Sequence, residues 1–284
     1  LSEEQLAAAY PKLTFEPGHE ALRQRDAFIL NPRELVRAEL VAAERAGATI
    51  VRDEVVALET GAHGVRVTAA SGRAWHGTRV VAATGAATNA AGLLPRPLVT
   101  PTFGATVVLA EVDGPDAVDM PTMMMLKFRD GERVFGGVVM APVQYPDGRW
   151  YLKVSGSNLL ENPLDTREEI AAWVRTGGEE RDIDETRVLL GELLPGTTFK
   201  EFRKRPCLVC ATATDRPYID WADERTIVLV EGERGAMSGD EIGRLASSLA
   251  LTGAWSDTIP QEVFAAVWAE PGWRTTTMLA GLGG

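Results

Sequence analysis

The chain has 284 residues and a formal charge of −11, with 45% hydrophobic and 24% charged residues. These proportions are typical of a globular protein that can bury a sizeable core in one large or two smaller domains. The negative charge argues against binding to nucleic acid or to an anionic membrane surface, because basic residues drive both. The sequence also contains no stretch of about 18 apolar residues, so no transmembrane helix is predicted.

The cysteine content and the first residues bear on the compartment. Two Cys cannot form a disulfide framework, which favours a reducing cytoplasm. The first residues include Glu3, Glu4 and Glu16, a composition unlike that of a secretory signal. We therefore expect a cytoplasmic protein.

The first part of the chain mixes predicted helices and strands. Ser2 and Gln5 have the spacing of a capping box for a short helix. Asn31-Pro32 begins a longer predicted helix, which Gly47 ends. Alternating or β-branched runs then predict strands, with a hairpin turn at Ser71-Gly72-Arg73. These strands are predicted at 49–51, 55–58, 65–69, 74–76 and 80–83.

A loop of small residues, Gly85-Ala86-Ala87-Thr88-Asn89, follows the last of these strands. Ligands of open α/β sheets bind outside the carboxyl ends of the strands, so Gly85 and Ala86 are candidate contacts. A close-packed turn is the alternative interpretation.

The chain changes character after Pro95-Arg96-Pro97. Four predicted strands follow one another with short turns, which is typical of an antiparallel or mixed sheet, and two predicted helices come next. A methionine-rich stretch, residues 120–125, is either adaptable core packing or the lining of a substrate pocket. The strands are predicted at 106–111, 122–127, 133–140 and 150–154, and the helices at 165–174 and 184–194.

Lys153 stands in the last of these strands, between Leu152 and Val154. Because side chains alternate along a strand, Lys153 should point to the face opposite its two neighbours. It is either a solvated edge residue or a functional cation.

The stretch from Arg203 to Leu251 predicts two strands, a glycine loop and a helix. Thr226–Val230 is a β-branched run typical of a strand that is buried on both faces. Gly232 and Gly235 follow, and Ser238-Gly239-Asp240-Glu241 has the pattern of a capping box that begins the helix. A glycine turn before a helix N-terminus suits an electron-rich ligand, although many α/β proteins use the same turn for packing.

Cys207 and Cys210 form a C-x-x-C pair, which could be a redox dithiol, half of a zinc site or two strand residues. The three His are isolated from the pair, so zinc does not fit and no metal site is predicted. Leu208-Val209 between them predicts an extended strand, in which residues three apart point to opposite faces. We therefore expect two independent Cys, and Cys207 could simply be a small buried hydrophobic residue.

Two stretches resemble a known flavoenzyme family without a gap between them: 207–212, Cys-Leu-Val-Cys-Ala-Thr, and Pro217-Tyr218-Ile219-Asp220. They are similar to the late flavin-contacting segment of the sarcosine oxidase branch of the D-amino-acid-oxidase-like flavoenzymes. Residues 31–50 and 80–86 also resemble this family, and the resemblance covers most of residues 26–250, the middle third only loosely.

The resemblance implies an FAD-dependent oxidoreductase that oxidises a C–N bond of a small amine or amino acid, with hydride transfer to flavin N5 and an imine product. Some members attach FAD covalently at the position of Cys207. A Lys in a context like that of Lys153 promotes reoxidation of the flavin, because a fixed cation stabilises superoxide in a poorly solvated site. The implied cofactor-binding residues are Cys207, Thr212, Gly232, Gly235, Ser238, Gly85 and Ala86.

The expected fold class is α/β, with an incomplete FAD-binding domain and an inserted mixed or antiparallel substrate-binding sheet. We expect residues 1–97 with 207–256 to form the FAD side, residues 98–206 the substrate domain and residues 257–284 a tail.

The sequence departs from the family at one point that affects the function. The family begins with a strand, a G-x-G-x-x-G turn and a helix that cradle the FAD pyrophosphate, and this sequence contains no such motif. We therefore expect the chain alone to bind FAD weakly or not at all.

Two alternatives are a non-catalytic binding relative and one subunit of a split flavoenzyme, whose partner chain supplies the pyrophosphate site. Glu231 and Glu233 weaken the catalytic interpretation, because acidic neighbours disfavour an anionic reduced flavin.

Overall fold

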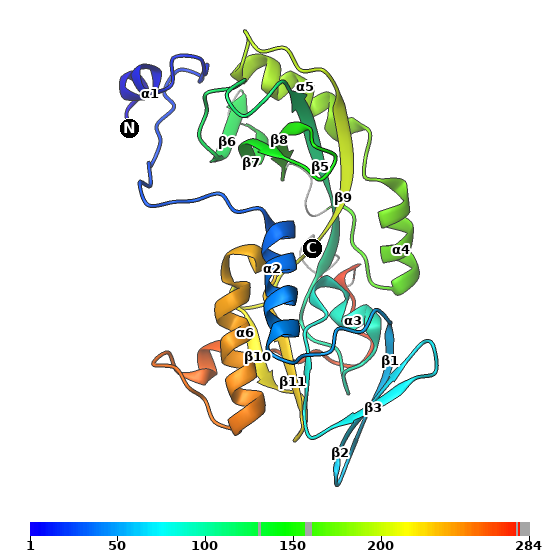
Figure 1. Ribbon diagram of the computed structural model, residues 1–284. Helices are drawn as coiled ribbons and strands as arrows, with labels where there is room; N and C mark the ends of the chain where they lie inside the picture. The colour runs from blue at the N-terminus through cyan, green and yellow to red at the C-terminus, as the bar shows by residue number, and fades with distance from the viewer. Residues whose placement is uncertain (130–131, 157–160, 277, 279–284) are drawn as a thin grey trace. The chain divides into compact units, whose positions relative to one another are not determined.

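The computed structural model describes residues 1–129, 132–156, 161–276 and 278 (Figure 1). The chain divides into two compact units, each made of three segments. The first unit contains residues 1–31, 105–159 and 173–207, and the second contains residues 32–104, 160–172 and 208–284.

A five-stranded sheet forms the centre of the first unit, in the order β6-β7-β8-β5-β9. The pairs β6–β7, β7–β8 and β8–β5 are antiparallel, which confirms the predicted succession of strands and short turns. The strands are β5 (Thr102–Val112), β6 (Met123–Arg129), β7 (Glu132–Gln144), β8 (Trp150–Ser155) and β9 (Phe202–Cys210), of which β5 and β9 each continue into the second unit.

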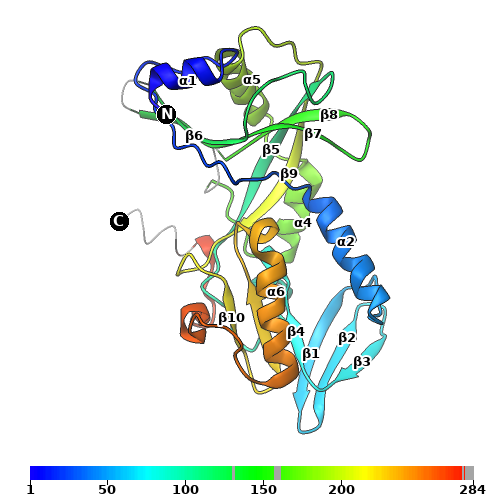
Figure 2. The same cartoon turned by 60° about the vertical axis from the view of Figure 1, so that its left-hand side comes forward.

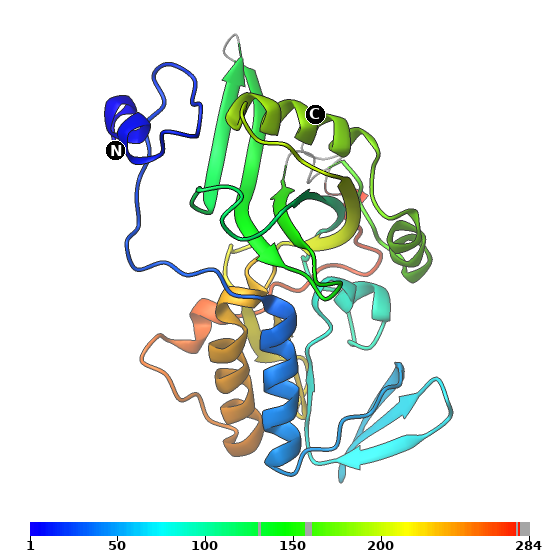
Figure 3. The ribbon, with the colours of Figure 1, turned by 45° about the horizontal axis from the view of Figure 1, so that its top comes forward.

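Helix α5 (Arg181–Leu193) covers one face of this sheet (Figure 3). Its buried residues, which include Leu190 and Leu193, pack with Leu152 and Val154 in the largest apolar core of the unit. This packing explains the i, i+3 spacing of leucines in α5, since that spacing places them on one face of a helix.

The first residues of the chain also pack on this core. Helix α1 (Glu3–Ala9) has the predicted capping box between Ser2 and Gln5. Leu13, beyond the helix, is buried in the same core as α5, and the Thr14 N–H donates to the Leu193 carbonyl at 2.9 Å. The sequence assigned residues 1–31 to the FAD side, whereas the structure places them in the unit of the large sheet.

The second unit contains a three-stranded sheet in the order β10 (Tyr218–Trp221), β11 (Thr226–Val230), β4 (Val80–Ala82). Strands β11 and β4 are parallel, and β10 pairs antiparallel with β11. Helix α6 (Gly235–Thr252) packs Ile242, Leu245 and Leu249 against these strands (Figure 1). The buried run predicted for residues 226–230 is therefore confirmed as β11.

The remaining elements belong mainly to the second unit. Strands β1 (Val55–Gly61), β2 (Gly64–Ala69) and β3 (Ala74–Gly77) form a separate antiparallel meander (Figure 2). Helix α2 (Pro32–Arg45) has no buried residue. The others are η1 (Gly85–Ala87), α3 (Thr88–Ala91), α4 (Arg167–Thr176) and η2 (Gln261–Phe264).

Two further expectations differ from the structure. Residues 49–51 are irregular and not a strand. Helix α6 begins at Gly235, so the capping box predicted at Ser238 is wrong. The described part of the predicted tail, residues 257–284, belongs to the second unit, and residues 277 and 279–284 lie outside the described residues. None of the described helices has the length and apolar character needed to cross a membrane.

Candidate functional site

Lys153 and Cys207 lie on the same face of the five-stranded sheet. Lys153 on β8 stands opposite Leu109 of β5, and Cys207 on β9 packs against Leu109 and Val107. Leu152 and Val154 point to the other face, into the core below α5. Lys153 therefore points to the face opposite its two neighbours, as the alternation predicted, and Cys207 lies on the same face as Lys153.

Lys153 is half-buried. The residue lies between Leu109 on one side and Met140 of β7 on the other, both directly opposite it in register. Directly opposite residues in antiparallel strands have Cβ atoms about 5 Å apart. A cation in such a place interacts with nearby charge more strongly than one in water.

The two cysteines have different environments, as the strand assignment predicted. Both are outside any disulfide. Cys210 is buried with Val228 and Val230 in the second unit, and its Sγ lies 3.9 Å from the Gly232 carbonyl. Burial, with a smaller contribution from Glu231, raises the pKa of the Cys210 thiol to about 11. Cys207 is half-buried and packs against the buried cluster of Val107, Leu109 and Tyr151.

A polar network on the same sheet face was not predicted. The Tyr151 hydroxyl donates to Asp147 at 2.8 Å, and the Arg203 guanidinium lies 6.0 Å from the Tyr151 ring centre. Arg203 also pairs with Glu201 at 2.7 Å and with Asp147 at 3.6 Å. The hydrogen bond from Tyr151 lowers the pKa of Asp147, and burial raises the pKa of the Tyr151 hydroxyl.

The sequence held one signal for this network, which is the alternation of polar residues along β8 and along β9, the two strands that carry it. Tyr151 is two residues from Lys153, and Arg203 is four residues from Cys207, so all four share one face of their strands. Their pairing across strands depends on the register of the sheet, which the sequence pattern did not give.

The remaining predicted residues belong to the second unit. Because β4 and β11 are parallel, their carboxyl ends meet at one edge of the small sheet. Gly85 and Ala86 follow β4, while Gly232 and Gly235 follow β11. The structure therefore brings the two glycine loops, which the sequence analysis considered separately, to the same edge of the small sheet.

The two residues after β4 have different surroundings. Gly85 has φ +55°, and a Cβ added there would meet nothing within 4 Å. Its left-handed backbone favours glycine, and the open space leaves room for a ligand. The Ala86 carbonyl accepts a hydrogen bond from the Thr102 hydroxyl at 3.0 Å, and its side chain packs near Val228. Ala86 thus has a packing role in this unit.

Gly232 and Thr212 have clear structural roles. Gly232 has φ +94°, and a Cβ there would lie 3.2 Å from the Cys210 carbonyl oxygen, so the close-packed turn requires glycine. The buried Thr212 hydroxyl donates to the Arg216 carbonyl at 2.7 Å and closes a local turn. Any contact of these two residues with a cofactor stays a prediction.

The start of α6 is the part of the edge that is open to a ligand. The helix begins at Gly235 without a side-chain cap, and a Cβ on Gly235 would meet nothing within 4 Å. Ser238 lies in the first turn, where its hydroxyl donates to the Arg234 carbonyl at 3.2 Å. The Glu231 carboxylate accepts from the Arg234 backbone N–H at 2.5 Å, so its charge is held beside a cationic residue.

These features suit an electron-rich ligand. A helix N-terminus offers backbone N–H donors and a positive dipole end to an electron-rich group, and the two open glycines leave space for it. Within the described part of the chain, no group of three or more His, Cys, Asp or Glu is arranged to hold a metal ion.

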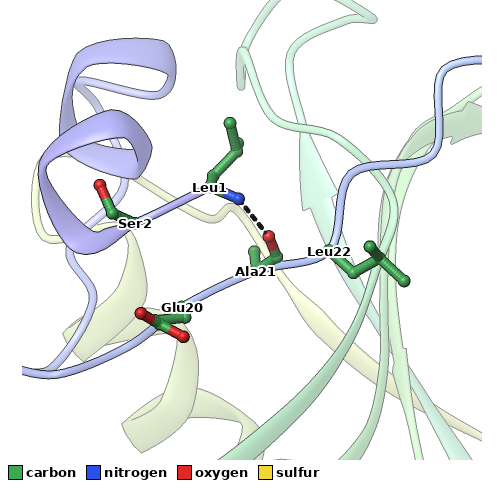
Figure 4. Close-up of a pocket in the computed structure, with 5 residues that line it drawn as sticks. All are labelled: Leu1, Ser2, Glu20, Ala21 and Leu22. Atoms are coloured by element: carbon green, nitrogen blue, oxygen red, sulfur yellow. Dashed lines mark hydrogen bonds between the residues drawn. The ribbon is translucent and has the colours of Figure 1, made fainter.

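A surface hollow of about 380 Å³ lies elsewhere, at the start of the chain (Figure 4). It is lined by Leu1, Ser2 and residues 20–22, and the Leu1 amino group donates to the Ala21 carbonyl at 2.5 Å. None of the predicted site residues lines it.

The fold and the site define a class: an α/β protein that combines a parallel strand pair carrying glycine turns with a larger antiparallel sheet. A sequence model of the FAD-dependent oxidoreductase (DAO) family matches residues 1–249. The chain therefore belongs to this family, whose cofactor is FAD.

Solved structures show the same fold. NikD, an unusual amino acid oxidase essential for nikkomycin biosynthesis, has a TM-score of 0.65 and 20% identity, with 85% of this chain and 61% of NikD covered. Iminodiacetate oxidase (IdaA) from Chelativorans sp. BNC1 has a TM-score of 0.54 and 18% identity, with 84% and 59% covered. Glycine oxidase from Geobacillus kaustophilus has a TM-score of 0.53 and 15% identity, with 84% and 58% covered.

The chain spans about three fifths of the length of these oxidases. At identities this low, the likeness establishes the fold. A comparison with curated protein sequences found no match.

Proposed function

We propose that this chain supplies the substrate sheet and one side of the flavin site of an oxidoreductase that acts on a C–N bond of a small amine or amino acid. The observation that supports this proposal is the common sheet face of Lys153 and Cys207. In this assignment the first unit binds substrate, and the glycine edge of the second unit binds FAD. When bound, FAD accepts a hydride from the carbon next to the substrate nitrogen, and the imine is then hydrolysed.

Lys153 has the role of a fixed cation beside the reacting groups. Its neighbours Leu109 and Met140 keep this part of the face poorly solvated. A positive charge there stabilises negative charge that develops on oxygen during reoxidation, because a low dielectric strengthens the attraction.

Cys207 has the role of holding the ring of the cofactor at the same face. Its side chain packs on Val107, Leu109 and Tyr151, which fixes the position of the thiol on the sheet. In the second unit, Gly85 and the start of α6 offer open backbone to a ligand.

An affinity-tagged chain purified from its native cells, together with whatever binds it, tests this function. Mixing it without oxygen with sarcosine or glycine should bleach the flavin absorbance and produce the aldehyde or oxoacid expected from an imine. Glycolate, which has an alcohol in place of the amine, is the matched control and should leave the flavin oxidised. The proposal is contradicted if glycolate reduces the flavin and the amines do not, or if neither amine reduces it.

A second candidate is a split enzyme in which a partner chain supplies the FAD pyrophosphate site. The observation that favours it is helix α2, whose Val36, Leu40 and Val41 are exposed apolar side chains on a helix with no buried residue. An amphipathic helix of a globular protein normally packs its apolar face against another element.

The same tagged purification separates these alternatives. A split enzyme should yield a second, glycine-rich chain with the flavin. Flavin bound to the tagged chain without any second chain contradicts the split. Absence of flavin from the purified assembly supports the non-catalytic relative.

A further inference from the structure

A buried carboxylate stands at the end of β11, on the edge that we assign to FAD. Glu231 directly follows the last residue of β11, and its side chain is only 8% exposed. Glutamates are seldom buried to this extent unless they are paired, because the loss of hydration costs free energy. The proposed reaction makes no use of this charge.

Positive groups at the start of α6 hold this carboxylate. The Arg234 backbone N–H donates to one oxygen of Glu231 at 2.5 Å, and the Arg234 guanidinium lies 3.6 Å from the other oxygen. The positive end of the α6 dipole is at the same place, because the helix begins at Gly235. Glu231 therefore supplies, from within the chain, the negative charge that such a helix end attracts.

The surroundings of Glu231 keep its charge in place and weakly screened. The Arg234 guanidinium also donates to the Asp215 carbonyl at 2.6 Å, which ties the arginine to a second loop. Burial raises the pKa of the Cys210 thiol, and the charge of Glu231 adds to that rise, so the carboxylate lies close to a desolvated part of the edge. Charges in poorly solvated surroundings act on one another more strongly than charges in water.

We infer that Glu231 sets the redox preference of the cofactor, because it makes the site favour oxidised over reduced flavin. This inference rests on the proposed function, since it requires FAD at the glycine edge. The ring of oxidised FAD is neutral, whereas the reduced ring is an anion at neutral pH. A fixed carboxylate repels that anion, and it also neutralises the positive helix end that would attract it. Glu231 therefore lowers the reduction potential of the bound flavin, which favours the passage of its electrons to oxygen.

Binding of the two redox forms of FAD to the 284-residue chain tests this role without turnover. Equilibrium dialysis measures the dissociation constant of oxidised FAD in air and that of reduced FAD under dithionite without oxygen. The pyrophosphate carries the same charge in both forms, so the ratio of the reduced to the oxidised constant reports the ring alone. In Glu231→Gln this ratio should fall about tenfold or more, which corresponds to a rise of about 30 mV in the reduction potential. The amide oxygen of Gln can still accept from the Arg234 N–H, so the turn is kept.

Two further variants separate the charge of Glu231 from a general effect on the loop. Glu233→Gln removes the same charge from an exposed side chain two residues away, where solvent screens it, so the ratio should stay within about twofold of the wild-type value. Arg234→Gln removes the cation beside Glu231 and should raise the ratio, which is the opposite direction. A loop that is only loosened would weaken the binding of both forms and leave the ratio unchanged.

Three outcomes overturn the inference. They are an unchanged ratio in Glu231→Gln, an equal change in Glu233→Gln, and absence of binding of both forms to every chain at millimolar FAD. The proposed function is judged separately, by whether the amines reduce the flavin of the purified assembly. Reduction by the amines together with an unchanged ratio removes the role of Glu231 and leaves the proposed function intact.

Discussion

The side chain of Lys153 differs from other lysines of the first unit in its surroundings. Lys153 is half-buried and stands opposite Leu109 and Met140 in the strand register. Lys200 is exposed and pairs with Asp113, and Lys127 is buried on the opposite face of the sheet, where it pairs with Glu16 and Glu192. The three lysines therefore differ in their burial and in the part of the sheet that they occupy.

Replacing Lys153 with Met should slow reoxidation of the reduced flavin by oxygen about a hundredfold, which corresponds to about 3 kcal/mol. Flavin reduction by the amine should change much less, because the lost charge acts on oxygen. Double-mixing stopped-flow of the flavin-containing assembly measures both steps, with Lys200→Met as the control. Equal slowing of the two steps means that Lys153 has a structural role.

Cys207 and Cys210 should differ strongly in reactivity. The pKa of Cys210 is raised to about 11, chiefly by burial, so at pH 8 only about 0.1% of it is the reactive thiolate. We expect iodoacetamide to modify Cys207 at least tenfold faster than Cys210 in the folded chain. Peptide mass spectrometry measures both rates, and in urea the difference should disappear. Faster modification of Cys210 in the folded chain contradicts the strand arrangement.

The pairing of β7 and β8 depends on two glycines that approach each other closely. A Cβ on Gly137 would lie 2.2 Å from the Ser155 carbonyl oxygen, and one on Gly156 would lie 2.7 Å from the Gly137 Cα. No side chain fits at either position without moving a backbone. This contact fixes the register that places Lys153 opposite Met140.

Gly137→Ala should therefore lower the free energy of unfolding by about 2 to 3 kcal/mol. Gly136→Ala is a matched control one residue away, because its Cβ would meet only the flexible side chains of Arg133 and Leu126, at 3.3 Å. The control should change stability by less than about 1 kcal/mol. Urea unfolding of both variants measures the difference, and similar stabilities would show that the strands can separate at this point.

At the level of elements, the sequence predicted most strands because alternation and β-branched runs are local signals. The helix start at Gly235 was missed because Ser238 has the composition of a cap, yet its hydroxyl bonds to the Arg234 carbonyl from inside the first turn. The pairing of Tyr151 with Arg203 was also missed. Contacts of this kind depend on which strands become neighbours, and that information is not local.

At the scale of the whole molecule, the first 31 residues show the same limit. Their helix was predicted, but their unit was not, because Leu13 and Glu16 bind partners more than a hundred residues away. The glycine edge after β4 and β11 shows it too, because both strands were predicted and their parallel pairing was not.

We expect the isolated 284-residue chain to bind FAD more weakly than micromolar. Gly85 and the start of α6 offer donors to one side of the cofactor, while the sequence contains no G-x-G-x-x-G turn for the doubly charged pyrophosphate. Equilibrium dialysis of the purified chain measures the affinity, with FMN as a control ligand that lacks the pyrophosphate. Sub-micromolar binding of FAD by the chain alone contradicts this prediction.

The division of each unit into three chain segments has a consequence for biosynthesis. Strand β4 ends at Ala82, and its partner β11 begins at Thr226, so the ribosome must add the whole intervening sequence before they can pair. At about 5–20 residues per second this delay is on the order of ten seconds. During that time the unpaired edge of β4 is open to wrong partners. Chaperones that hold the nascent chain should therefore raise the yield of folded protein.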